Sequence, residues 1–296
     1  HAAYQHLAAG QTQQVTIPVT VTDSAGATDT QNLVITVTGT DDAAVIAGVD
    51  TGDITENTAG SNMSPDYAQP GIATLGNAPL YADGKLTITD PDAGENAFDT
   101  RHGAYDYHGT YGDLALQADG TWHYHADAGH WTAAGGYATT RGTAIDQLGE
   151  GQSLTDTITV YSKDGTAHDI VITIHGSNDR PYCSSEVQLA SGTEDVARTL
   201  TLKQFLANTV DVDANDAGKL SISGLKVDHG SVRDNQDGTF TYTPEKDYNG
   251  QVHFTYDVKD AHGGVTHTGA STTLAATPDA AVITGTDTGD ITEDRN

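Results

Sequence analysis

The chain has 296 residues, and 41 Asp and Glu against 13 Lys and Arg give it a formal net charge of −28 at pH 7. So much negative charge excludes a nucleic-acid or anionic-membrane partner, because both need a basic surface. One cysteine excludes an internal disulfide, and without an apolar run of about 18 residues the sequence predicts no direct membrane insertion.

Internal repetition divides the chain into four predicted pieces. Asp42–Asn57 returns as Asp279–Asp294 with three differences in sixteen positions, and Leu7–Asp23 resembles Leu148–Asp164. The pieces are a partial repeat carrying C-terminal strands at 1–42, a complete module at 43–179, a second complete module at 180–279, and the first strand of a following repeat at 280–296. We therefore expect an interior segment of a longer protein.

Apolar and polar residues alternate along each piece, which predicts half-buried antiparallel strands. The alternation runs through Val15–Val21, Leu33–Val37, Ile158–Val160, Ile172–Ile174 and Val252–Val258. Asp-Gly and Asn-Gly pairs between such runs predict tight turns, and Pro18 predicts an edge strand. Thr201–Asn208 is the one predicted helix. The expected fold is all-β, with tandem antiparallel β-sandwiches of the Ig or cadherin-like kind.

Three motifs of the first module resemble the VCBS repeat in the order in which that repeat carries them. They are GKLTITDPDAGE (Gly84–Glu95), GTYGDLALQADGTWHY (Gly109–Tyr124) and the run Leu148–Asp179. The second module resembles the cadherin-like repeat of the same proteins through GTED (Gly192–Asp195), Asp211–Ile222, Asp237–Gly250 and Phe254–Gly264.

Such repeats occur in giant RTX-type bacterial adhesins that are exported by type I secretion. The resemblance therefore implies an extracellular place on the bacterial cell surface, dependence on calcium, and a role in attachment and biofilm formation. The glycine-rich RTX nonapeptide is absent from this sequence, which agrees with an interior segment.

Acidic residues recur at the start, middle and end of both complete modules. Calcium binds six to eight oxygen ligands, which clustered carboxylates supply, so we expect Ca²⁺ at the loops and domain junctions. The candidate ligands are Glu56, Asp90, Asp92, Asp164, Asn178 and Asp179, then Glu194, Asp195, Asp211, Asp213, Asp216, Asp260 and Asp279, and finally Glu293. The alternative is that these are solvated turn residues, since Asp and Asn are common in turns. Their recurrence in the same order favours metal.

Two long excursions, at 61–84 and 125–144, make the first module longer than the VCBS pattern. Loops on a rigid scaffold often bind ligands, and Trp, Tyr and Arg are enriched at binding hot spots. The candidate ligand-binding residues are Arg101, Tyr105, Tyr107, Asp127, Trp131, Tyr137 and Arg141. We hypothesise a calcium-assisted site for a short peptide or a glycan. The alternative is that these aromatic residues only pack against the sandwich.

His123, His125 and the nearby His130 could bind zinc. His123 and His125 lie two apart on a predicted strand, while Trp122 and Tyr124 take the opposite, buried face. The histidines would then face solvent, and the many oxygen ligands favour calcium over zinc.

The predicted function is calcium-dependent, non-enzymatic attachment to a peptide, protein or glycan on a host or neighbouring cell, by a chain that is monomeric within a longer protein. The first alternative is a calcium-rigidified extender without a ligand site. The second is a hydrolase, although the sequence shows no nucleophile elbow, phosphate loop or zincin helix.

Overall fold

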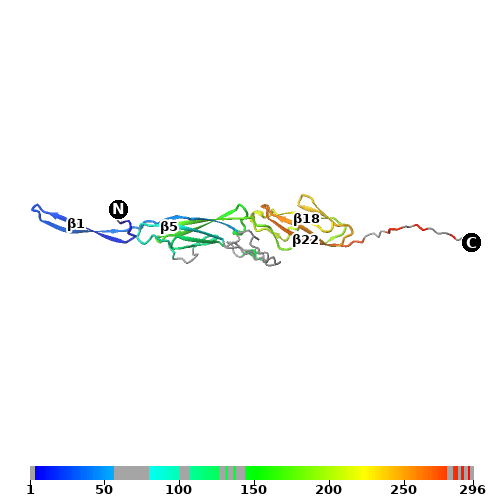
Figure 1. Ribbon diagram of the computed structural model, residues 1–296, viewed down its shortest axis with the longest axis horizontal. Helices are drawn as coiled ribbons and strands as arrows, with labels where there is room; N and C mark the ends of the chain where they lie inside the picture. Colours follow the sequence, from blue (N-terminus) through cyan, green and yellow to red (C-terminus); the bar gives the residue numbers. More distant parts are fainter. Residues whose placement is uncertain are drawn as a thin grey trace. The chain divides into compact units, whose positions relative to one another are not determined.

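The computed structural model describes residues 4–56, 80–100, 107–126, 131–132, 136–137, 144–278, 283–285, 288–289 and 293. The chain forms two compact units. The first unit comprises His1–Arg180 together with Asp211–Gly218 and Ala261–Gly264, and the second comprises Pro181–Val210, Lys219–Asp260 and Val265–Asn296. Figure 1 shows β1 and β5 in the first unit and β18 and β22 in the second. Among the described residues, no helix has the length and apolar character needed to cross a membrane.

The first unit begins with a two-stranded hairpin of β1 (Thr12–Thr22) and β2 (Thr28–Thr38). The strands are antiparallel and pair from Thr12 with Thr38 to Thr22 with Thr28. The apolar side chains on this hairpin remain largely exposed: Ile17 is 43% exposed, Val19 46%, Leu33 51% and Ile35 42%. The hairpin therefore carries the alternation of a half-buried strand pair, although no second sheet covers it within the part of the chain that the structure describes.

Two sheets form the sandwich of the first unit. One has the order β11-β12-β4, and the other has the order β3-β5-β8-β7-β6. The strands are β3 (Val45–Gly48), β4 (Thr51–Thr55), β5 (Leu80–Thr89), β6 (Tyr107–His108), β7 (Gly112–Leu116), β8 (Thr121–Ala126), β11 (Ser153–Tyr161) and β12 (Ala167–His175). A separate short pair joins β9 (Trp131–Thr132) to β10 (Gly136–Tyr137).

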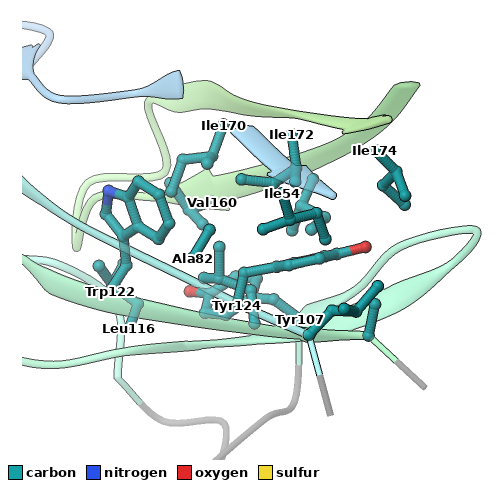
Figure 2. Close-up of a cluster of buried hydrophobic side chains, with 14 of the residues drawn as sticks. Ile54, Ala82, Tyr107, Leu116, Trp122, Tyr124, Val160, Ile170, Ile172 and Ile174 are labelled. Carbon is teal, nitrogen blue, oxygen red and sulfur yellow. The ribbon is translucent and has the colours of Figure 1, made fainter. Parts of the chain in front are cut away.

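The core of the first unit lies between these two sheets. Figure 2 shows Trp122 and Tyr124 of β8 pointing toward Ile170 and Ile172 of β12. All four side chains are fully buried. The indole Nε1 of Trp122 donates to the carbonyl of Val49 at 2.7 Å, so the one polar atom of this ring is satisfied inside the core.

The second unit is also a two-sheet sandwich. One sheet has the order β14-β22-β21-β18, with β15 also on β22, and the other has the order β16-β20-β19. Its strands are β13 (Tyr182–Cys183), β14 (Val187–Gln188), β15 (Gly192–Thr193), β16 (Arg198–Thr201), β17 (Thr209–Val210), β18 (Ser221–Val227), β19 (Ser231–Asp234), β20 (Thr239–Thr243), β21 (Gly250–Lys259) and β22 (Val265–Ala275). β13 pairs with β17.

A cluster of aromatic rings fills the second core. The ring of Phe205 meets Phe240, Phe254 and Tyr256 edge-on, at centroid distances of 5.6, 5.8 and 5.2 Å. Phe205 belongs to helix α2 (Leu202–Phe205), which Thr201 starts with a capping box closed by Gln204. The predicted helix within Thr201–Asn208 is therefore confirmed, but it is a single turn.

The all-β prediction is confirmed, with one difference in strand direction. β4 runs parallel to β12, and β14 and β15 run parallel to β22, whereas the other pairs within the sheets are antiparallel. The alternation that predicts a strand carries no information on its direction, because both directions place alternate side chains on opposite faces. The boundaries between the four predicted pieces remain predictions.

Candidate metal centres

The first acidic cluster consists of Asp41, Asp90, Asp92 and Glu95 in the first unit. One oxygen from each of Asp41, Asp92 and Glu95 lies within 4.8 Å of the others. Asp90 follows β5 directly, and its Oδ1 accepts from the backbone N–H of Asp92 at 2.8 Å. This turn directs two carboxylates two residues apart toward one place.

The carboxylates of this cluster are only partly satisfied. Asp92 is 2% exposed, and its Oδ2 accepts from the N–H of Asp42 at 2.8 Å. Asp92 Oδ1, Asp90 Oδ2 and Glu95 Oε2 are buried and have no hydrogen-bond partner. Loss of hydration, and to a smaller extent repulsion from neighbouring carboxylates, raises the pKa of Glu95 above its usual value. A buried anionic oxygen without a donor is costly, and a cation would remove that cost.

The second acidic cluster consists of Glu56, Asp179, Asp211, Asp213 and Asp216, and it also belongs to the first unit. One oxygen from each of Asp211, Asp213 and Asp216 lies within 4.8 Å of the others. A 3-10 turn, η3 (Ala214–Asp216), places Asp216 beside Asp213. Asp216 is fully buried, and its carboxylate contacts the N–H of Ala261 at 3.0 Å and Nδ1 of His262 at 2.8 Å.

Glu56 completes the second acidic cluster from the end of β4. It is 5% exposed, and its Oε1 accepts from the N–H of Ser177 at 2.8 Å, while its Oε2 is buried without a hydrogen-bond partner. Burial, together with repulsion from Asp179, Asp146 and Asp213, raises the pKa of Glu56 to about 9. Burial and the same kind of repulsion, largest from Asp213, raise the pKa of Asp179 to about 8. Without a cation these two groups hold protons at neutral pH.

The two clusters are built by the same backbone contacts. Asp213 N–H donates to Asp211 Oδ1 at 3.0 Å, as Asp92 N–H donates to Asp90 Oδ1. Asp179 N–H donates to Asp213 Oδ2 at 2.9 Å, as Asp42 N–H donates to Asp92 Oδ2.

A further contact extends the correspondence to a neighbouring loop. Ala214 N–H donates to the carbonyl of Gln147 at 3.0 Å, and Ala93 N–H donates to the carbonyl of His6 at 3.1 Å. The chain therefore constructs one arrangement of acidic groups twice.

Glu194 in the second unit repeats the environment of Glu56. It is 2% exposed, its Oε1 accepts from the N–H of Thr277 at 2.5 Å, and its Oε2 accepts from Asn249 Nδ2 at 3.2 Å. Asp195 is exposed, adopts a left-handed backbone with φ 57°, and accepts from the N–H of Asp247 at 3.0 Å. Here an asparagine, rather than a further carboxylate, faces the buried glutamate.

The remaining predicted metal ligands are placed as follows. Asn178 precedes Asp179 and is half-buried, and Asp260 is 8% exposed in the second unit. Asp164 accepts from the N–H of Ala44 at 3.0 Å and from the hydroxyls of Ser162 and Thr166. Burial raises its pKa, but these hydrogen bonds together outweigh burial and lower it. Glu293 is exposed, and Asp279 lies outside the described residues.

Sequence reasoning missed Asp41, Glu95 and Asp146 as members of these clusters. The spacing carried a signal for Glu95, because Asp90-x-Asp92-x-x-Glu95 matches Asp211-x-Asp213-x-x-Asp216. Nothing local marks Asp146, whose charge raises the pKa of Glu56 and Asp179 only because the fold brings it near them.

The predicted ligand-binding residues are described only in part. Arg101, Tyr105, Asp127 and Arg141 lie outside the described residues, as do the side chains of Trp131 and Tyr137, whose backbones pair across β9 and β10.

Tyr107 is a correction to the predicted ligand surface. It is 8% exposed, and its hydroxyl donates to the carbonyl of Asp99 at 2.7 Å. Its side chain therefore packs in the core and is not available to a surface ligand.

The two histidines on β8 lie on the face predicted for them. Trp122 and Tyr124 are fully buried, whereas His123 and His125 between and after them are partly exposed. His123 Nδ1 contacts Asp83 Oδ1 at 2.5 Å, and the His125 ring lies 5.2 Å from that of Tyr81. These contacts with Asp83 and Tyr81 account for the positions of both rings on the outer face of the sheet, so a metal is not needed to explain them.

A family model for the cadherin-like domain matches residues 177–275. No curated protein matches this sequence significantly. Residues 177–275 are thus similar to a cadherin-like domain, and the match begins at the linker that supplies Asn178 and Asp179.

Among solved structures, the chain is similar to the protocadherin gamma B4 extracellular domain, with 14% identity, a TM-score of 0.41, and coverage of 88% of this chain and 38% of that one. Protocadherin gamma B2 extracellular cadherin domains 1–5 give 15% identity, a TM-score of 0.40, and coverage of 90% and 46%. An endo-fucoidan hydrolase from glycoside hydrolase family 107 gives 16% identity, a TM-score of 0.26, and coverage of 90% and 34%. The chain spans between a third and a half of the length of these three proteins.

Proposed function

We propose that this chain is an extracellular, calcium-ordered segment of a large bacterial surface adhesin of the RTX type, and that it acts in attachment and not in catalysis. The observation that carries the proposal is the acidic cluster built twice by the same contacts. Asp90 Oδ2, Asp92 Oδ1 and Glu95 Oε2 in one copy, and Glu56 Oε2 in the other, are buried without a hydrogen-bond donor. The cadherin-like domain at residues 177–275 and the resemblance of residues 43–179 to VCBS repeats support the same reading.

Calcium is the cation that suits these groups. Carboxylates and backbone carbonyls are hard oxygen ligands, and calcium accepts six to eight of them in irregular geometry. Asp41, Asp92 and Glu95 would hold one ion, and Asp211, Asp213 and Asp216 another, with Glu56 completing the second acidic cluster. A bound ion would also join the linkers at Asp41 and Asp179 to the loops that follow, so it would stiffen the chain at both positions.

The test is calcium titration of the metal-stripped protein by calorimetry, together with melting curves in calcium and in EDTA. Millimolar calcium at a micromolar site adds about 4 kcal/mol of stability, so EDTA should lower Tm by more than about 10 °C when several sites empty. Asp169→Asn is the matched control, because Asp169 is exposed and only accepts from Thr159 Oγ1 at 2.6 Å. Identical melting curves in calcium and EDTA, with no heat of binding, would refute the proposal.

The attachment site of this adhesin is proposed on the excursions 61–84 and 125–144 of the first module, for a short peptide or a glycan. The pairing of Trp131 with Tyr137 places two residues of hot-spot type at one hairpin of this region. Glycan and peptide arrays, probed with and without calcium, test the site. Replacing Trp131 and Arg141 with alanine should abolish the signal and leave the melting curve unchanged. A segment that acts only as an extender would give no signal in either state.

A further inference from the structure

Two pairs of loops meet within the first unit. Each pair joins an acidic loop, Asp90–Glu95 or Asp211–Asp216, to the loop in front of a hairpin, here called the tail loop: His6–Gln11 before β1 and Gln147–Gln152 before β11. In each pair the N–H of the alanine in the acidic loop donates to the carbonyl of the first residue of the tail loop, at 3.1 Å and 3.0 Å. This bond holds the acidic loop to the tail loop.

The two tail loops have the same backbone hydrogen bond. Gln11 N–H donates to the Ala8 carbonyl at 2.9 Å, and Gln152 N–H donates to the Gly149 carbonyl at 3.0 Å. Ala8 and Gly149 therefore occupy the same place in the two tail loops. Because both pairs of loops make the same backbone contacts, these contacts cannot distinguish one pair from the other.

The side chains at the contact do differ. In the second pair the side chain of Asn215 lies directly over Gly149. A Cβ added to Gly149 would stand 2.5 Å from both Cγ and Nδ2 of Asn215 and would overlap its Oδ1. Gly149 is buried and does not have a left-handed backbone. Glycine is therefore required there by the space that Asn215 takes, and not by the backbone conformation.

The first pair of loops has the reverse arrangement. Ala8, in the place of Gly149, carries a side chain and is 5% exposed. Gly94, in the place of Asn215, carries none, and a Cβ added to it would meet nothing within 4 Å. In each pair, one of the two positions is thus glycine and the other carries a side chain.

We propose that these two positions decide which acidic loop a tail loop accepts, so that the order of the repeats is encoded by side chains at their linkers. A tail loop with alanine rejects an acidic loop with asparagine, because the methyl group and the amide would occupy the same space. A tail loop with glycine accepts an acidic loop with glycine, but it leaves a gap where contacts are lost. This goes beyond the proposed function, which does not concern the order of the repeats.

A chain of similar repeats needs such a distinction. Leu7–Asp23 resembles Leu148–Asp164, and the two acidic loops share the spacing of their acidic residues. Repeats of similar sequence exchange elements and misassemble during folding, and a steric clash against the wrong partner suppresses this. The two positions contain no carboxylate, so the distinction does not depend on a bound cation.

A double-mutant cycle at the second pair, in the full chain, tests the proposal. Gly149→Ala creates the mixed pair of alanine and asparagine, and Asn215→Gly creates two glycines. The double variant recreates the pair that the first loops carry. Hydrogen exchange of the Ala214 amide, followed by NMR in EDTA and in calcium, is the readout, because this N–H holds the acidic loop to the Gln147 carbonyl.

Gly149→Ala should accelerate the exchange of the Ala214 amide about tenfold or more. Adding Asn215→Gly should reverse most of that acceleration, because the overlap disappears. Asn215→Gly by itself should have a smaller effect than Gly149→Ala, since it leaves a gap and no overlap. Glu150→Ala is the matched control, because Glu150 lies beside Gly149 on the same tail loop and is exposed. It should leave the exchange unchanged.

Two results would overturn the proposal. One is an exchange rate in Gly149→Ala equal to that of the unaltered chain. The other is a double variant that is no better protected than Gly149→Ala, which would mean that alanine disturbs the tail loop itself. If Gly149→Ala does not fold, a folded double variant with a protected Ala214 amide supports the pairing, and an unfolded one overturns it. Because rescue is also measured in EDTA, it can be seen even if calcium does not bind, so the proposed function and this pairing fail separately.

Discussion

Asp179 and Asp213 meet through the backbone of one and the side chain of the other: the N–H of Asp179 donates to Oδ2 of Asp213 at 2.9 Å. The two residues are 34 positions apart in the chain. A loop rich in aspartate thereby holds the linker in a fixed conformation, and the carboxylate that holds it also belongs to the proposed calcium site. Removing the cation should therefore weaken the linker as well as the site.

Asp92→Asn should weaken the calcium site of the first acidic cluster and leave that of the second intact. Asp213→Asn should do the reverse. The amide keeps an oxygen that can accept from the linker N–H, but it loses the charge that attracts the cation. Calcium affinity at the altered site should fall at least tenfold, measured by titration calorimetry. Asp169→Asn, at an exposed position, should leave calcium binding at both clusters unchanged. An equal effect from all three variants would mean that net charge, and not a built site, attracts calcium.

The metal-free protein should lose stability as the pH rises from 5.5 to about 9. The pKa of Glu56 is about 9 and that of Asp179 about 8 in the folded state, against ordinary values of 4.5 and 3.8. The folded state binds more protons than the unfolded state between these values, so its stability decreases through that window. Asp119 and Asp164 have lowered pKa values, so their contribution is complete above about pH 5 and constant in this window.

Urea unfolding in EDTA at pH 5.5, 7 and 8.5 measures the slope of the unfolding free energy against pH. Glu56→Gln should flatten it, because the neutral amide has no proton to lose. Saturating calcium should also flatten it, since the ion replaces the protons. A stability that rises with pH in EDTA would contradict the assigned pKa directions.

Asp156→Ala should strongly destabilise the first unit. The fully buried carboxylate of Asp156 accepts from the N–H groups of Thr110 at 2.7 Å, Tyr111 at 3.0 Å and Gly112 at 3.0 Å, and from Tyr124 Oη at 2.8 Å. Its removal leaves four donors without their acceptor inside the sandwich, at a cost of about 3–5 kcal/mol. Tyr124→Phe removes a single bond and should cost about 1 kcal/mol.

Urea unfolding at saturating calcium compares these two variants with Asp169→Asn, which should be nearly neutral. Equal costs for Asp156→Ala and Tyr124→Phe would mean that the three backbone donors find other partners.

Phe205→Ala should destabilise the second unit. The ring touches three other aromatic rings, and the Phe205 carbonyl accepts from Tyr256 Oη at 2.7 Å. A cavity of this kind costs about 3–5 kcal/mol. Calorimetric scans should show the transition of the second unit shifted to lower temperature or lost, while the tryptophan fluorescence transition of the first unit, which contains both Trp122 and Trp131, stays unchanged. A shift of both transitions would show that the two units unfold together.

The sequence by itself determined the all-β fold, the turns at Asp119-Gly120 and Asp237-Gly238, the presence of a short helix within Thr201–Asn208, and the buried face of Trp122 and Tyr124. Each depends on local information, namely period-two alternation and turn residues. The same rule was wrong for Asp83-Gly84, which lies inside β5 and pairs with His123 and Trp122 of β8, because Gly84 there leaves room for the Trp122 ring. The repeat of Asp42–Asn57 at Asp279–Asp294 was also visible without a structure.

Only the tertiary structure decided which acids meet. Among 41 acidic residues, composition cannot separate Asp41 and Asp146, which lie close to other carboxylates, from Asp119, which is exposed and bonds Thr121 and Lys85. The tertiary structure also buries Tyr107 in the core and pairs β4 with β12 in the parallel direction. Contacts between residues far apart in sequence depend on how the sheets pack, and the strand pattern is the same whichever partners are chosen.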